Sequence, residues 1–253
     1  MYDELGSDYD RFVNWPSRLA LELPFLEREL RAVSARRVLD VACGSGQHAI
    51  ALAERGYELA GADLSPVMID LARRNAASER LMLRFEVAGF GAMHERMGAG
   101  YDALLCLGNS LPHLLDPETV LAALTDMAAC LRPGGLLVIQ NRNFDRVVAR
   151  RERWMEPQSH READREWLFL RFYDWEAGGL IGFNMITLRR DGAGEWQQLT
   201  SRTQLRPQLR DELATTTAQS GFAQVRVFGD LMASPFDRET SGNLVLVARR
   251  ASL

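Results

Sequence analysis

Two aspartates and a glycine-rich turn are the residues most able to bind a ligand in this sequence. The segment Val38-Leu39-Asp40-Val41-Ala42-Cys43-Gly44-Ser45-Gly46 has the pattern of a strand that enters a tight turn and then a helix. Glycine lets backbone approach a ligand closely, and a helix N-terminus favours an anionic group. Asp63 comes nineteen residues after Gly44, at the end of the second predicted strand. A carboxylate at this position can accept both hydrogen bonds of a ribose diol. A glycine turn alone is often only a tight turn, and an acid such as Asp63 alone can cap a helix. Together, the turn and the acid predict a nucleoside-cofactor site.

Asp40 indicates which nucleoside cofactor fits. A dinucleotide turn must accept a pyrophosphate close to its glycines, and a carboxylate directly before the turn would repel that dianion. The same carboxylate would attract a cationic group. Asp40 therefore argues against NAD and favours a cofactor with a positively charged end.

Short apolar strands alternate with amphipathic helices over residues 36–140, which predicts a doubly wound parallel sheet. The predicted strands are Arg37–Val41, Tyr57–Ala62, Met82–Val87, Tyr101–Leu107 and Leu136–Gln140. The predicted helices are Gln47–Arg55, Pro66–Ala76 and Pro117–Cys130, with a weak helical pattern in 88–100 and an earlier helix over Pro16–Val33.

After Gln140 the pattern becomes β-rich. Residues 166–206 contain three long stretches separated by Gly178-Gly179 and Gly192-Ala193-Gly194, which predicts an antiparallel three-stranded insertion with hairpin turns. A helix over Pro207–Ser220 and two strands, Gln224–Gly229 and Asn243–Ala248, are then expected to return to the main sheet. Aromatic and methionine side chains of the insertion could wall an apolar pocket or form its core: Trp167, Phe169, Tyr173, Trp175, Phe183 and Met185.

The pattern Leu39-Asp40-x-x-x-Gly44-x-Gly46 resembles motif I of the class I S-adenosylmethionine (SAM) methyltransferases, and the resemblance runs over about residues 36–142. It implies an α/β fold, a Rossmann-like doubly wound seven-stranded sheet, with SAM as cofactor and S-adenosylhomocysteine as product. In this reading Asp40 positions the methionine end, Asp63 the ribose and Phe90 the adenine. The cofactor-binding residues that the resemblance implies are Tyr9, Trp15, Arg18, Asp40, Ala42, Gly44, Gly46, Asp63, Leu64, Met68, Gly89, Phe90 and Leu107.

The aromatic N-terminus resembles the lid that closes over SAM in many small-molecule methyltransferases. It contains Tyr2, Tyr9, Phe12 and Trp15, followed by Arg18. Aromatic faces suit a sulfonium as they suit other soft cations. The alternative is a helix that packs its aromatics on the sheet.

Two later segments resemble the glycine N-methyltransferases. They are Cys106-Leu107-Gly108-Asn109-Ser110, with His113-Leu114 after it, and Arg132-Pro133-Gly134-Gly135-Leu136-Leu137-Val138-Ile139, followed by Arg142-Asn143-Phe144-Asp145. In that family the matching asparagine and arginine hold the substrate carboxylate, which implies substrate binding by Asn109 and Arg142. His113 either lines the substrate pocket or bonds loop backbone.

The sequence departs from the family at several positions. Leu111-Pro112 and Gln140-Asn141 differ from it, and Gly89-Phe90 stands where the class commonly has an acid or amide that meets the adenine amine. Beyond residue 150 there is no close match. We therefore expect a single domain with a lid and helix (1–33), a SAM-binding core (36–150), a β insertion over the active site (151–206) and a C-terminal return (207–253).

Composition excludes several other functions. The chain has 253 residues, 47% of them hydrophobic and 25% charged, which is typical of soluble globular proteins. Its net charge of −4 gives no excess of positive charge that would attract a polyanion such as a nucleic acid. All 30 basic residues are arginine, so mechanisms that need a lysine amine are excluded. The cysteines, Cys43, Cys106 and Cys130, are far apart in apolar stretches, which indicates buried thiols and no metal site. No apolar run approaches a membrane span, so a cytoplasmic protein is expected.

These observations predict a SAM-dependent methyltransferase that acts on the nitrogen of a small amine or amino acid similar to glycine or sarcosine. No general base is identified. Alternatives are an O- or N-methyltransferase of a larger natural product, a nucleic-acid base methyltransferase, a SAM-binding regulator and an NAD oxidoreductase. Base methyltransferases commonly carry an Asn-Pro-Pro-aromatic turn, where this chain has Gly108-Asn109-Ser110-Leu111. The expected partner is a small molecule rather than a nucleic acid or membrane, and a homo-oligomer is compatible with the sequence.

Overall fold

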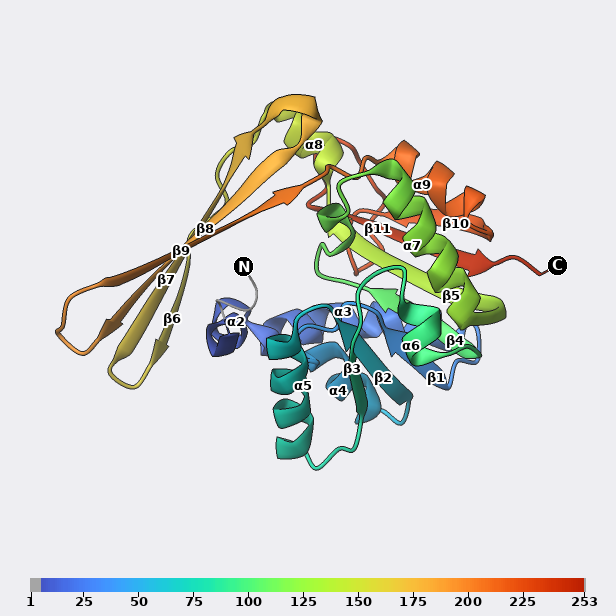
Figure 1. The fold of residues 1–253 in the computed structure, drawn as a ribbon, viewed down its shortest axis with the longest axis horizontal. Helices are drawn as coiled ribbons and strands as arrows, with labels where there is room; N and C mark the ends of the chain where they lie inside the picture. Colours follow the sequence, from blue (N-terminus) through green and yellow to red (C-terminus); the bar gives the residue numbers. More distant parts are fainter. Residues whose placement is uncertain (1–5, 253) are drawn as a thin grey trace.

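A seven-stranded mixed sheet forms the centre of the protein (Figure 1). The computed structural model describes residues 6–252, apart from the side chain of Ser7, so Tyr2 lies outside the described residues. The strand order is β10-β11-β5-β4-β1-β2-β3, and β11 alone runs antiparallel to its neighbours. The strands are β1 Arg37–Asp40, β2 Glu58–Asp63, β3 Arg84–Val87, β4 Tyr101–Cys106, β5 Leu131–Arg142, β10 Phe222–Phe228 and β11 Asn243–Arg250. The predicted doubly wound sheet is confirmed.

Helices cover both faces of this sheet. One face packs against α3 Trp15–Arg31, α4 Gln47–Ala53 and α5 Pro66–Ser78, through buried residues such as Leu26, Leu52 and Ile69. The other face packs against α6 Met93–Met97, α7 Pro117–Cys130 and α9 Arg210–Gln219. Ser65 caps α5 as its sequence predicts, because its Oγ accepts a hydrogen bond from Met68 N at 3.1 Å and Pro66 occupies the first helical position. Two helical layers around one sheet leave the carboxyl ends of the parallel strands as the site-forming edge.

The insertion after β5 is a four-stranded antiparallel sheet that extends away from the core (Figure 1). Its strands are β6 Gln158–Glu162, β7 Arg165–Trp175, β8 Ile181–Asp191 and β9 Gln197–Leu205. The prediction of three strands is wrong, because β6 was missed. This edge strand reads Gln-Ser-His-Arg-Glu and is largely exposed, so it carries no apolar alternation.

Some predicted boundaries also shift. Strand β3 begins at Arg84 because Met82 is fully exposed before it. Strand β5 begins directly where α7 ends, and α9 begins at Arg210 rather than Pro207.

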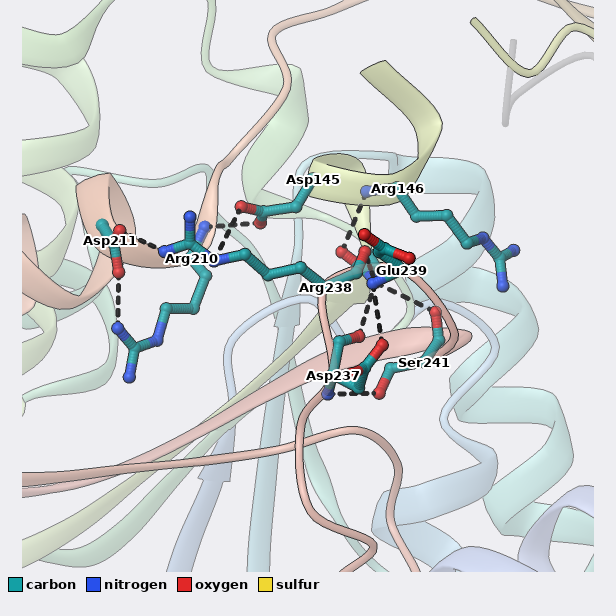
Figure 2. Close-up of polar contacts among 9 residues, drawn as sticks. Asp145, Arg146, Arg210, Asp211, Asp237, Arg238, Glu239 and Ser241 are labelled. Carbon is teal, nitrogen blue, oxygen red and sulfur yellow. Dashed lines mark hydrogen bonds and ion pairs between the residues drawn. The ribbon is translucent and has the colours of Figure 1, made fainter. Parts of the chain in front are cut away.

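Polar contacts fix the residues that follow β5, and Figure 2 shows those around Asp145 and Asp237. The Nδ2 of Asn143 donates hydrogen bonds to the carbonyls of Asp237, Arg238 and Ser241 at 3.0–3.3 Å. Asp145, in α8 Phe144–Arg150, accepts a hydrogen bond from the backbone N–H of Arg210 at 2.9 Å. These contacts join α8, the start of α9 and the 229–242 loop, and so hold the residues that follow β5 in place.

Within residues 6–252, no helix is long and apolar enough to cross a membrane. No group of three or more His, Cys, Asp or Glu side chains within the same range could hold a metal ion.

Candidate active site

Asp63 ties the glycine turn to the start of α5. One carboxylate oxygen accepts a hydrogen bond from Gly44 N at 2.9 Å, and the other accepts one from Ser65 N at 2.9 Å. Gly44 has φ +53°, a conformation that favours glycine. The turn and the acid that sequence spacing places together therefore meet at the carboxyl ends of β1 and β2.

A cavity of about 430 Å³ opens beside this turn. Nine of the thirteen predicted cofactor residues line it: Tyr9, Ala42, Gly44, Asp63, Leu64, Met68, Gly89, Phe90 and Leu107. Leu64 is 75% exposed although it is a large apolar residue, which suits a surface that a flat ring can cover. The cavity has the size and the lining of a nucleoside site.

Asp40 lies buried behind the turn rather than in the cavity wall. Burial raises its pKa to about 7, the neighbouring Asp63 adds to the rise, and Ala42 N, 3.4 Å from Oδ1, opposes it. Asp40 forms no ion pair with any residue of the described range. The charge of Arg18, which pairs with Glu22 at 3.0 Å, also lowers this pKa. A buried carboxylate that forms no ion pair fits a ligand that brings a cation.

Trp15 and Gly46, two other predicted cofactor residues, serve the structure around the cavity. Trp15 is buried, packs edge-on against His48 and donates its Nε1–H to Asp10 at 2.8 Å. Gly46 has φ +81°, and a Cβ there would lie 3.0 Å from Ala72 Cβ. The geometry thus places Trp15 in the core and Gly46 at a close contact between α4 and α5.

Asp10 is a residue that the sequence reading missed. Its carboxylate accepts hydrogen bonds from Trp15 Nε1, from Ser45 Oγ at 2.5 Å and from Asn75 Nδ2 at 3.0 Å. The N-terminal segment is therefore fixed to the glycine turn and α5. The sequence carries little signal for this role, because Asp3, Glu4 and Asp8 are further acids in the same aromatic N-terminus.

Tyr9, in the short helix α2 Tyr9–Phe12, lies across the glycine turn. Its ring would be 3.6 Å from a Cβ on Gly44. Burial and the carboxylates of Asp63, Asp10 and Asp40 raise its pKa to about 12, against the opposing charge of Arg18. Tyr9 therefore presents a neutral phenol to the cavity.

A second cavity, of about 510 Å³, adjoins the first. Tyr9 and Gly108 line both cavities, and Arg18, Asn109 and Arg142 line the second. Asn109 has φ +69° and accepts a hydrogen bond from Arg142 N at 2.9 Å through Oδ1. The predicted substrate residues Asn109 and Arg142 are therefore neighbours, and the predicted cofactor residue Arg18 faces their cavity instead.

His113 lines the first cavity rather than the second. Burial lowers its pKa to about 4, so the imidazole is neutral at physiological pH. The predicted substrate residue His113 therefore lies apart from Asn109 and Arg142, which line the second cavity.

The insertion supplies one wall of the second cavity. Tyr173, Phe183 and Met185 line it, and Trp167 and Phe169 pack with Met185 against Tyr9 and Phe12. Arg171 also lines the second cavity. It is not among the predicted site residues, because the sequence alone does not show which face of a strand meets the core.

Comparisons with known proteins agree with this architecture. A family described as "Methyltransferase domain" matches residues 38–135. The chain is 38% identical over 146 residues to a glycine/sarcosine N-methyltransferase of Parasynechococcus marenigrum, a match that covers 58% of this chain and 52% of that protein. It is 37% identical over 144 residues to the glycine N-methyltransferase of Rattus norvegicus, covering 53% and 49% of the two chains. The chain thus spans about half the length of the curated relatives it matches.

Solved structures match over nearly the whole chain. A SAM-dependent methyltransferase from Clostridium acetobutylicum superposes with a TM-score of 0.80 at 12% identity, covering 99% of both chains. A SAM-bound amino pentose methyltransferase from Micromonospora echinaspora gives 0.72 at 23% identity, covering 97% of this chain and 95% of that one. The expected fold, that of the class I methyltransferases, and the expected resemblance to the glycine N-methyltransferases are both confirmed.

Proposed function

We propose that this chain, which contains a methyltransferase domain and has the class I methyltransferase fold, transfers a methyl group from SAM to the nitrogen of a small amine. One observation carries the proposal above the others. A nucleoside-sized cavity with Asp63 at its edge and a second cavity with Asn109 and Arg142 adjoin at Tyr9 and Gly108. Such an arrangement brings a donor and an acceptor together at a shared boundary.

The residues of the first cavity fit SAM. Asp63 stands where a ribose diol would bind, Phe90 and Leu64 offer apolar surfaces for adenine, and buried Asp40 forms no ion pair within residues 6–252. When bound, SAM supplies a methyl group on a positively charged sulfur. Asp40 would attract the ammonium end of the cofactor, and this interaction favours the ionised form of the carboxylate.

The chain's own contribution is orientation and exclusion of water. Tyr9 and Tyr173 both have pKa values raised to about 12 by burial, so neither phenol accepts a proton at neutral pH. Glu22, the carboxylate of the second cavity, is held by Arg18 at 3.0 Å and by His48 at 2.6 Å. We therefore propose that the acceptor amine binds neutral and that positioning accounts for most of the acceleration.

The acceptor is proposed to be an amine or amino acid. This rests on Asn109 and Arg142, which match the carboxylate-binding residues of the resembled family, and on the glycine and sarcosine activities in the relatives' names. A larger amine is the second candidate, because 510 Å³ lies within the range of about 300–1,000 Å³ found for pockets of drug-sized ligands.

The test is a methyl-transfer assay with SAM and a panel of acceptors, in which S-adenosylhomocysteine formation is quantified and the methylated atom is identified by mass spectrometry. The panel contains glycine, sarcosine, larger amino acids, aminosugars and phenols. The proposal predicts N-methylation of at least one amine and none of the phenols. O-methylation alone would contradict it.

A further inference from the structure

The second cavity contains positive charge that its own residues do not balance. Arg18, Arg142 and Arg171 line it, and Glu22 is the one carboxylate among its described lining residues. Glu22 is already paired with Arg18 and His48. The guanidinium groups of Arg142 and Arg171 are therefore left facing the cavity without a carboxylate of their own there.

Arg142 has a weak partner. Its Nη2 lies 3.7 Å from one oxygen of Glu152, whose other oxygen lies 2.9 Å from Arg146. The Nε of Arg142 is buried and has no hydrogen-bond partner among the described residues. An unpartnered buried N–H costs free energy that a ligand acceptor would recover.

The positive charge of Arg171 is balanced even less than that of Arg142. It comes from β7 of the insertion, its Nε is buried without a hydrogen bond, and it forms no ion pair with any residue of the described range. Its guanidinium lies 4.6 Å above the ring of Phe12 in the N-terminal segment. Burial and, to a lesser extent, the charge of Arg142 lower its pKa to about 10, so each cation disfavours the other.

Arg142 and Arg171, which line the same cavity, have the chemistry to bind an oxyanion. Each presents planar donors that match carboxylate or phosphate oxygens, and an anion between them would relieve both the repulsion and the unpartnered N–H groups. Apolar residues of the same cavity lining, Met155, Phe183 and Leu205, offer a surface for a carbon body.

Building on the proposed function, we propose that the methyl acceptor is an amine with an oxyanionic group and an apolar or sugar body larger than glycine. Its oxyanion binds between Arg142 and Arg171. Arg171, contributed by the insertion, is then a specificity-determining residue that selects acceptors by charge. A carboxylate and a phosphate share this chemistry, and the experiment separates them.

The experiment compares matched acceptors that differ in one anionic group. L-Phenylalanine is compared with phenethylamine for a carboxylate, and glucosamine 6-phosphate with glucosamine for a phosphate. Binding to the full chain is measured by calorimetry, with and without S-adenosylhomocysteine, and kcat and KM are measured with SAM. In at least one pair the anionic member should bind tenfold or more tightly than its neutral partner.

Arg171→Gln tests the residue itself. Losing a charge-assisted hydrogen bond should weaken the anionic acceptor about 10- to 100-fold, mainly through KM, and leave its neutral partner and S-adenosylhomocysteine within twofold. Arg171→Lys should restore part of the preference. Arg165→Gln is the matched control, because Arg165 lies on the same strand but outside the cavity lining.

Equal binding of both members in both pairs would overturn the inference, and so would an Arg171→Gln variant that weakens both members equally. If S-adenosylhomocysteine fails to bind the wild type, the proposed function fails instead. The anion preference measured without cofactor then still decides whether Arg171 selects an oxyanion.

Discussion

At the scale of single residues, the site depends on two aspartates with different tasks. Asp63 holds backbone N–H groups of Gly44 and Ser65 at 2.9 Å each and stays at the cavity edge. Asp40 is buried with a pKa raised to about 7. The first organises the turn, and the second is a buried carboxylate to which a cationic ligand would be attracted.

This difference predicts a pH-dependent affinity. Below pH 7 the free protein carries a neutral Asp40, so binding a cationic cofactor end must first remove a proton. The dissociation constant for S-adenosylhomocysteine should therefore rise about tenfold for each pH unit below 7 and level off above it. Calorimetry between pH 5.5 and 8.5 measures this dependence.

Asp40→Asn is the companion variant, because it keeps the shape but cannot ionise. It should bind more weakly above pH 7 and show a flat profile. A wild-type affinity that stays constant across this range would show that Asp40 does not pair with the cofactor.

At the scale of elements, the glycine turn works because α4 and α5 approach closely beside it. A Cβ at Gly46 would lie 3.0 Å from Ala72 Cβ and 3.1 Å from Phe85 Cζ, at φ +81°. Glycine is thus required there for packing as well as for backbone conformation.

Gly46→Ala should lower the free energy of unfolding by about 1–3 kcal/mol through strain and overpacking, as measured by urea denaturation. Gly56→Ala is the matched control, because Gly56 has φ +90° but nothing within 4 Å of an added Cβ. The control should lose only the conformational part, about 1 kcal/mol. Equal losses in the two variants would mean that crowding at Gly46 is unimportant.

Local sequence pattern explains which parts of the fold and of the site could be predicted. The strands of the core and the positions of Asp40 and Asp63 follow from local pattern, since each strand, turn and helix is encoded by neighbouring residues. The β6 strand and the wall position of Arg171 do not, because an exposed edge strand needs no apolar alternation and a strand's facing side depends on what packs against it. Asp10 was missed for the same reason, since its partners Ser45 and Asn75 are distant in sequence.

At the scale of the whole molecule, the N-terminal segment connects the core to the insertion. Asp10 fixes this segment to the glycine turn, and Phe12 packs edge-on against Phe169 of β7 with ring centroids 5.4 Å apart. Tyr9, which belongs to the same segment, lines both cavities. We therefore expect that a ligand that orders the first cavity also orders the wall that the insertion contributes to the second cavity.

Hydrogen exchange tests this connection. S-adenosylhomocysteine should slow exchange in residues 42–46, in 9–15 and in the central part of β7. Phe169→Ala should keep the slowing at 42–46 and lose it in β7, because the aromatic contact is gone.

Phe172→Ala is the control, because Phe172 lies on the same strand and packs against Trp154 instead, with ring centroids 5.0 Å apart. It should behave as the wild type. Slowing in β7 that survives Phe169→Ala would mean that the insertion responds to ligand by another route.

SAM binding in the first cavity is tested most directly by calorimetric titration of the wild type and Asp63→Ala with S-adenosylhomocysteine. NAD is the control ligand, and circular dichroism verifies folding. We expect one site in the wild type, at least tenfold weaker binding in the variant and no binding of NAD. A folded wild type that does not bind S-adenosylhomocysteine, or a variant that binds it equally well, would contradict the assignment of this cavity to SAM.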